Sequence, residues 1–182
     1  MTVARPASAL VSLALAVAAL AAFAACTAAP PPDPGATQVP PMATPSQAVA
    51  AAAALVEAEL VEAGFELAPS PVEHRPGEPD AVQDAPRAIY RVNLAEPGEG
   101  WVLIYDLGSP DAAQAAGQAF AAFLGSGVGQ TNYPRDAQFA LSRAGSALVF
   151  SYWSRERSGD PELAQAAFEA IRDVGQQIEV RR

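Results

Sequence analysis

The sequence predicts an α+β fold: a helix followed by two strand-strand-helix units, with a four-stranded antiparallel sheet and the helices packed on one face. Two observations lead to this prediction. Runs of alternating apolar residues come in pairs separated by turn residues, and each pair precedes a helix that begins with a capping residue, a proline and an acid. Residues 47–182 are also numerous enough for a single globular domain with a hydrophobic core.

Residues 1–25 are predicted to be a targeting segment outside the fold. Arg5 supplies a positive charge, and an uncharged apolar stretch follows from Ala7 to Ala25. The next motif, Phe23-Ala24-Ala25-Cys26, resembles the lipobox of bacterial lipoproteins, although Phe23 stands where Leu is usual. The resemblance implies cleavage before Cys26, a lipid on its thiol, and a location in the cell membrane or outer membrane, facing the periplasm or exterior.

Two other interpretations of the N-terminus stay open. Secretory cleavage at Ala22-Phe23-Ala24 would leave a thiol near the new terminus. An uncleaved membrane-spanning helix is the second, because about 20 apolar residues can cross a bilayer, although alanine makes this stretch weakly hydrophobic. Cys26 is the chain's one cysteine, so its lipidation would leave no thiol for a disulfide, a metal site or catalysis.

The chain is strongly acidic, and this charge limits its partners. Its net charge is -9, and removal of Arg5 with residues 1–25 makes it more negative by one unit. Such acidity disfavours binding to nucleic acid and to anionic lipid surfaces through charge. We therefore expect no nucleic-acid partner, contact with the membrane through the lipid on Cys26, and an envelope protein or glycan as possible partner.

Residues 26–46 are predicted to be the lipidated cysteine and a tether. The segment is rich in proline, which favours an extended polyproline conformation over a packed core. At about 3.1 Å per residue, it would hold the domain up to roughly 60 Å from the lipid. Its prolines are Pro30, Pro31, Pro32, Pro34, Pro40, Pro41 and Pro45.

The domain is predicted to begin with an alanine-rich helix from Ser46 to Ala63, ending at Gly64. Leu55, Leu60 and Phe65 are its candidates for burial. Residues 68–87 then contain five prolines and several charges, and they predict an exposed loop. This loop is interpreted as a tolerated insertion or as a functional flap.

The first strand-strand-helix unit is predicted from Arg87–Leu94, Gly100–Leu107 and Ser109–Leu124, with a turn between the strands. In the helix, Ser109 is the expected N-cap and Pro110 the first helical residue. Its expected buried stripe consists of Ala116, Phe120, Phe123 and Leu124.

The second unit is predicted from Ala137–Arg143, Ala147–Trp153 and a helix from Asp160 to Ile178. The residues that this helix is expected to bury are Leu163, Ala167, Ile171, Val174 and Ile178. The two helix starts align, with Ser109-Pro110-Asp111 matching Asp160-Pro161-Glu162. This similarity indicates an internal repeat or, as the alternative, the shared chemistry of helix starts.

Few residues of the sequence indicate catalysis. His74 is the single histidine and lies in the proline-rich segment without a neighbouring set of metal ligands. The glycine-rich run Gly125–Gly129 follows a helix and lacks the lysine of a phosphate-binding loop, so it is interpreted as a helix end leading into a loop. We expect no cofactor, no metal site and no catalytic residue.

The residues Arg91, Trp153 and Arg155 are the candidate interaction surface. Aromatic residues and arginine are enriched in binding hot spots, and alternation along the strands could place these three on an exposed sheet face. The alternative is that the tryptophan fills the core and the arginines are solvated. The function predicted is a non-enzymatic binding or interaction module; the alternatives are an envelope enzyme that uses carboxylates and a structural accessory subunit.

Overall fold

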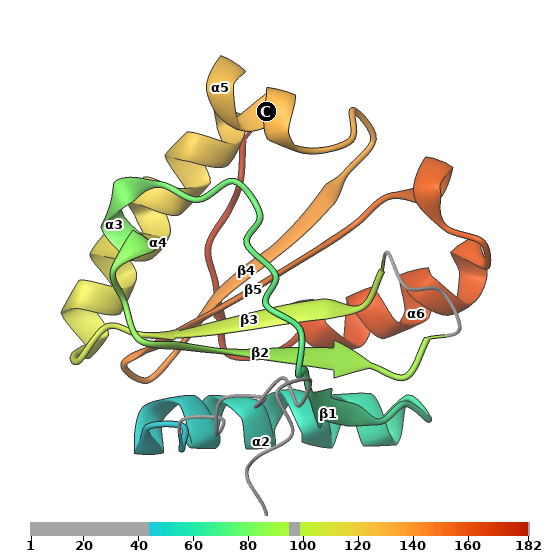
Figure 1. The fold of residues 1–182 in the computed structure, drawn as a ribbon, viewed down its shortest axis with the longest axis horizontal. Helices are drawn as coiled ribbons and strands as arrows, with labels where there is room; N and C mark the ends of the chain where they lie inside the picture. Colours follow the sequence, from blue (N-terminus) through green and yellow to red (C-terminus); the bar gives the residue numbers. More distant parts are fainter. Residues whose placement is uncertain (1–43, 95–98, 182) are drawn as a thin grey trace, which may run out of the picture. The chain divides into compact units, whose positions relative to one another are not determined.

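The computed structural model describes residues 44–94 and 99–181, which form a six-stranded antiparallel sheet with helices on both faces (Figure 1). The order of the strands is β1-β2-β3-β5-β4-β6. The strands are β1 Leu67–Pro69, β2 Arg87–Val92, β3 Trp101–Asp106, β4 Gln138–Ala144, β5 Ala147–Trp153 and β6 Gln176–Gln177. The α+β class is confirmed, whereas the prediction of four strands is wrong.

In residues 44–94 and 99–181, five helices and one 3-10 turn accompany the sheet. They are α2 Gln47–Glu62, α3 Asp80–Gln83, α4 Pro110–Gly125, α5 Gly127–Asn132, α6 Pro161–Arg172 and the 3-10 turn η1 Arg155–Arg157. The predicted caps of the two later helices are confirmed, because the side chains of Ser109 and Asp160 accept backbone N–H bonds at the starts of α4 and α6. Ser46 caps α2 in the same way. Helix α6 ends six residues before the predicted end at Ile178.

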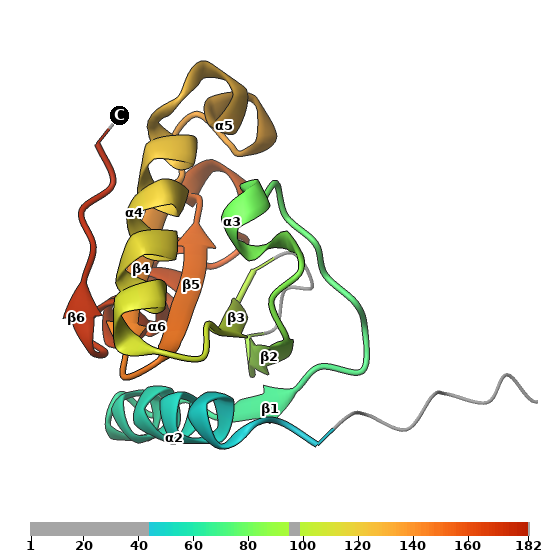
Figure 2. The ribbon, with the colours of Figure 1, turned by 90° about the vertical axis from the view of Figure 1, so that its left-hand side faces the viewer.

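The prediction that the helices pack on one face is also wrong. Helices α2 and α6 cover one face of the sheet, and α4 covers the other (Figure 2). The reason lies in the central strands, whose side chains are buried on both sides: Val102, Leu103, Ile104 and Tyr105 of β3 and Leu148, Val149 and Phe150 of β5 are at most 1% exposed. Such unbroken apolar runs require a cover on each face.

The two additional strands lie at the edges of the sheet and are very short. Strand β1 pairs with β2 from Leu67 opposite Val92 to Pro69 opposite Tyr90. Strand β6 pairs with β4 and follows Gly175, whose positive φ of 67° reverses the chain after α6. Strands of two or three residues show no alternation, so the sequence pattern did not indicate them.

Helix burial agrees with the predicted stripes in part. Leu60, Phe120, Leu124 and Ile171 are buried, whereas Leu55 is 51% exposed and Leu163 is 43% exposed. Phe65, Ala116, Ala167 and Val174 are also buried. The helices thus present the expected faces to the core, except that Leu55 and Leu163, which were expected to be buried, are exposed.

The glycine-rich run is not a plain loop, because its second half opens α5. Ser126 caps this short helix by accepting a bond of 3.1 Å from the Gly129 N–H. A Cβ atom at Gly129 would lie 1.9 Å from the Phe123 carbonyl oxygen. Gly129 therefore permits the close contact between α5 and the end of α4.

The two strand-strand-helix units differ in arrangement. Their hairpins pair through β3 and β5 in antiparallel fashion, but α4 and α6 lie on opposite faces of the sheet. If the two units were related by twofold symmetry, the antiparallel pairing of β3 with β5 would require a rotation axis perpendicular to the sheet. Such a rotation leaves both helices on the same face, unlike the arrangement of α4 and α6. The similar helix starts are accounted for by their caps and first-turn prolines, as in the alternative interpretation.

Candidate functional site

The three residues of the predicted interaction surface do not meet on one exposed face. Trp153 is 3% exposed and packs near Phe168 of α6, with ring centroids 6.3 Å apart. Arg91 alternates with Tyr90 along β2 and lies on the opposite side of the sheet, where its guanidinium is 4.4 Å from the Trp101 ring centroid. Arg155 is exposed in η1. The expectation that Trp153 is exposed is wrong, because α6 covers that face.

Arg91 is part of the sheet rather than an open surface cation. It donates a hydrogen bond of 2.9 Å to the Glu99 carbonyl oxygen. Its guanidinium also lies against Trp101, the residue directly opposite it on β3. Cross-strand stacking of this kind holds the ends of β2 and β3 together.

Cys26 and most of the predicted tether lie outside the described residues, as does the predicted signal peptide. Within residues 44–94 and 99–181, no helix has the length and apolar character needed to span a membrane. In the same ranges, no three His, Cys, Asp or Glu residues are grouped closely enough to hold a metal ion.

His74 stacks on Trp101, which the sequence did not indicate. The two rings are 4.3 Å apart between centroids and inclined by 10°. Burial, and secondarily the charge of Arg91, lower the pKa of the His74 imidazole from its ordinary value, while Glu78 acts in the opposite direction. The neutral imidazole therefore suits this position, where it fixes one part of the proline-rich segment to the sheet.

A second contact fixes the same segment through Glu78, whose side chain is 5% exposed. Arg87 Nη1 donates to both carboxylate oxygens of Glu78, at 2.6 and 2.7 Å. The Tyr105 hydroxyl donates to Oε1 at 2.6 Å. Burial and this carboxylate raise the pKa of the Tyr105 hydroxyl far above its usual range, so it remains a donor.

Residues 68–87 are therefore exposed only in part. Val82 of α3 is completely buried in the core. The Tyr133 hydroxyl donates to the Gly77 carbonyl oxygen at 2.7 Å. Residues 71–73 and 75, by contrast, are exposed. The predicted exposed loop is instead a segment attached at several points, and its exposed first part forms the wall of a groove.

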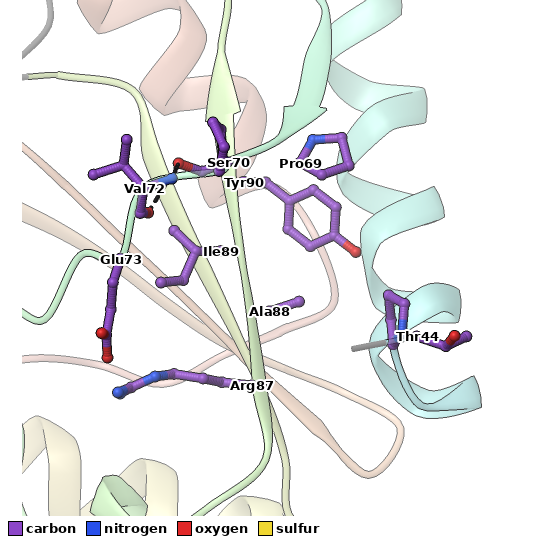
Figure 3. A pocket seen from close by; sticks show the side chains of 11 residues that line it. Thr44, Pro69, Ser70, Val72, Glu73, Arg87, Ala88, Ile89 and Tyr90 are labelled. Carbon is purple, nitrogen blue, oxygen red and sulfur yellow. Dashed lines mark hydrogen bonds between the residues drawn. The ribbon is translucent and has the colours of Figure 1, made fainter. Parts of the chain in front are cut away.

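This groove, called here the β2-edge groove, has a volume of about 450 Å³ (Figure 3). It lies between the start of α2, the end of β1 and the first half of β2. Tyr90 and Ala88 project toward α2, while Ile89 and Arg87 project toward the opposite wall, where Val72 and Glu73 lie. The lining residues are Thr44, Pro45, Pro69, Ser70, Pro71, Val72, Glu73, Arg87, Ala88, Ile89 and Tyr90.

The floor of the groove is an open strand edge. The Ser70 N–H donates to the Ile89 carbonyl oxygen at 2.8 Å, and β1 pairs with no residue of β2 before this point among the described residues. The Val92 N–H donates to the Gly100 carbonyl oxygen, and the Asp106 N–H donates to the Pro86 carbonyl oxygen. The even-numbered residues of β2, Ala88 and Tyr90 among them, therefore direct their backbone groups toward β3. Alternation then directs the Ile89 N–H and both backbone groups of Arg87 into the groove.

The groove wall turns away from β2 because of Ser70. Its hydroxyl donates to the Val72 carbonyl oxygen at 3.0 Å and accepts from the Val72 N–H at 3.2 Å. The adjacent prolines Pro69 and Pro71 have no N–H with which to continue a ladder. This local turn ends β1 and separates the wall from the edge of β2.

The two buried carboxylates of the described residues do not share a cavity. Glu99, which is 3% exposed, lines a small cavity of about 10 Å³ with Trp153 and Phe168, and Glu78 is not among its lining residues. Glu78 is instead bonded to Arg87 and Tyr105. A pair of carboxylates facing one cleft, which would favour the enzyme interpretation, is not formed by these two residues.

Comparison of the chain with protein-family models, with curated proteins and with solved structures finds no match.

The groove itself was not predicted from the sequence, because its walls come from segments distant from β2. One local signal could have indicated the groove. The prolines in Pro69-Ser70-Pro71 would end an edge strand, and the alternating run that begins at Arg87 could then extend beyond it with an unpaired edge.

Proposed function

We propose that this chain is a lipid-anchored protein of the bacterial cell envelope whose domain is a non-enzymatic binding module, with the β2-edge groove as its binding site. The groove supports the proposal because it combines apolar side chains with unpaired backbone donors and an acceptor in one concave surface. The lipobox-like motif at Cys26 supports the anchor.

The distribution of ionisable groups favours binding over catalysis. The buried Glu78 carboxylate accepts hydrogen bonds from both Tyr105 and Arg87, so the hydrogen-bonding capacity of these groups serves the fold. His74 is held on Trp101 rather than directed into the β2-edge groove, of which it is not a lining residue. The groove therefore offers complementarity of shape and hydrogen bonding more than acid-base chemistry.

The anchor and the groove are tested separately. Intact-mass analysis of the membrane fraction should detect an acylated chain that begins at Cys26, and Cys26→Ser should release the protein from the membrane. A water-soluble product beginning at Ala25 contradicts the lipid anchor. These measurements do not depend on what occupies the groove.

The groove is tested by photo-cross-linking in the intact envelope. A benzophenone amino acid at position 72 should cross-link one specific molecule, whereas the same group at position 61 should not. Val72 and Val61 are both 60% exposed, and Val61 lies on α2 outside the groove lining. Mass spectrometry identifies the product, and binding is then repeated with the two purified components. Equal cross-linking from both positions contradicts a binding site at the groove.

A further inference from the structure

We propose that the occupant of the β2-edge groove is an extended, uncharged polypeptide segment of a partner protein, which pairs with β2 as an additional strand. This inference rests on the proposed binding function and specifies its ligand. The open edge presents the Ile89 N–H and the N–H and C=O of Arg87 in strand geometry. A peptide in this position would follow the line that β1 occupies beside Tyr90–Val92.

The spacing of these groups selects a polypeptide. Successive outward-facing residues of a strand are separated by about 6.8 Å, the distance at which an extended peptide presents its own N–H and C=O groups. Strand addition to an open edge gains affinity from these main-chain bonds and selectivity from side-chain pockets. The groove supplies such pockets on both sides of the edge, with Ile89 and Val72 on one side and Tyr90 on the other.

The charge of the groove indicates an uncharged ligand. Only two of its lining residues are charged, Glu73 and Arg87, and their charges are opposite. Arg87 is 10% exposed and bonded to Glu78, and Glu73 is bonded to Arg75. A strongly charged segment would therefore find no unpaired counter-charge among these side chains, whereas apolar residues at alternate positions would contact Val72 and Ile89.

Tyr90 adds one directional contact. Its ring closes the groove on the side of α2, and its hydroxyl makes no hydrogen bond with the described residues. Burial raises the pKa of the Tyr90 hydroxyl, which therefore stays protonated and can donate to a carbonyl oxygen of the peptide. This donor lies beside the backbone groups of β2, so one bound strand can reach both.

The test uses the full mature protein and three synthetic pentapeptides that alternate valine and threonine. One is unmodified, one is N-methylated at the residues that face β2, and one is N-methylated at the residues that face away. We expect the first and third peptides to bind and the second to fail, because N-methylation on the inner side removes the inter-strand bonds. Fluorescence anisotropy measures the affinity, and amide exchange should slow at Ile89 and Arg87.

Two variants check the position of the peptide. Val72→Glu should weaken binding by about tenfold or more, whereas the matched Val61→Glu should leave it unchanged. Because both valines are equally exposed, the two variants should fold alike. An equal loss in both variants, or equal binding of the two N-methylated peptides, overturns the proposal.

Other occupants give distinct results. If the protection of the Ile89 and Arg87 amides from exchange grows with protein concentration in the absence of peptide, the occupant is a second copy of the chain. If an oligomer of N-acetylglucosamine displaces the peptide, the occupant is a glycan. Either result overturns the proposal. Absence of protection at both amides with millimolar unmodified peptide also overturns it. A cross-link specific to position 72 together with failure of all peptides would leave the binding function in place and refute this ligand class.

Discussion

The substitution Glu78→Gln should destabilise the domain strongly, because it removes the negative charge opposite a buried guanidinium. Glu78 is 5% exposed and Arg87 is 10% exposed, so water cannot replace the lost charge. Loss of one partner from a buried ion pair costs about 3–5 kcal/mol, and glutamine retains part of the hydrogen bonding, so we expect a loss of about 3 kcal/mol. The Tyr105 hydroxyl keeps an acceptor in the amide oxygen.

Urea unfolding followed by circular dichroism measures this loss. For an m value of about 2 kcal/mol/M, the midpoint should fall by about 1.5 M. The control is Glu73→Gln, which removes a carboxylate at the same distance of 2.6 Å from its arginine, Arg75, but with both side chains more than 60% exposed. The control should leave the midpoint unchanged. Equal effects of the two substitutions would refute the role assigned to burial.

Three further predictions concern His74 and two glycines. Because the pKa of the His74 imidazole is lowered in the folded state, its contribution to the free energy of unfolding should be fully present above about pH 6.5 and should decline as the pH falls toward the folded pKa. NMR titration of this single histidine measures the pKa shift. His74→Asn should flatten the decline below about pH 6.5 in urea unfolding, and an unchanged slope would contradict the assignment. Gly175→Ala should lower the thermal midpoint more than Gly108→Ala, because both have positive φ but only at Gly175 would a Cβ atom lie 2.6 Å from the Arg143 carbonyl oxygen.

Local signals in the sequence predicted most elements of this fold. Caps, first-turn prolines and apolar periodicity located α2, α4 and the start of α6, and alternation located the four longer strands. These signals act within a few residues, so they are readable without knowledge of the tertiary structure. The predicted helix was too long because Val174 and Ile178 continue the apolar period of α6 beyond Arg172, where the helix ends. Gly175, with its positive φ, then reverses the chain.

The placement of the helices could not be obtained in the same way. Trp101, Leu103 and Tyr105 take alternate positions along β3, but the intervening Val102 and Ile104 are also apolar. An unbroken run of this kind indicates a strand covered on both sides. The expectation of an exposed sheet face, and with it the surface assigned to Trp153, resulted from giving alternation more weight than this run.

The candidate site was missed because its parts are brought together by contacts that no local pattern encodes. Proline and charge in residues 68–87 indicate a loop, but they do not show that His74 stacks on Trp101 or that Glu78 meets Arg87 and Tyr105. These contacts join residues up to 27 positions apart in the chain. They convert the proline-rich segment from a solvated loop into the wall of a groove.

The same contacts shape the open strand edge in the β2-edge groove. An exposed edge is an aggregation hazard, and short length and proline are common protections against it. Here the open edge comprises only Arg87–Ile89, and the wall at Pro69–Val72 flanks it. Because His74 and Glu78 fix the chain that continues from this wall, the groove is preformed, which would lower the entropic cost of binding the proposed ligand. An edge that is short and flanked by a wall would leave room for the single extended strand proposed above, but not for the edge of a second sheet.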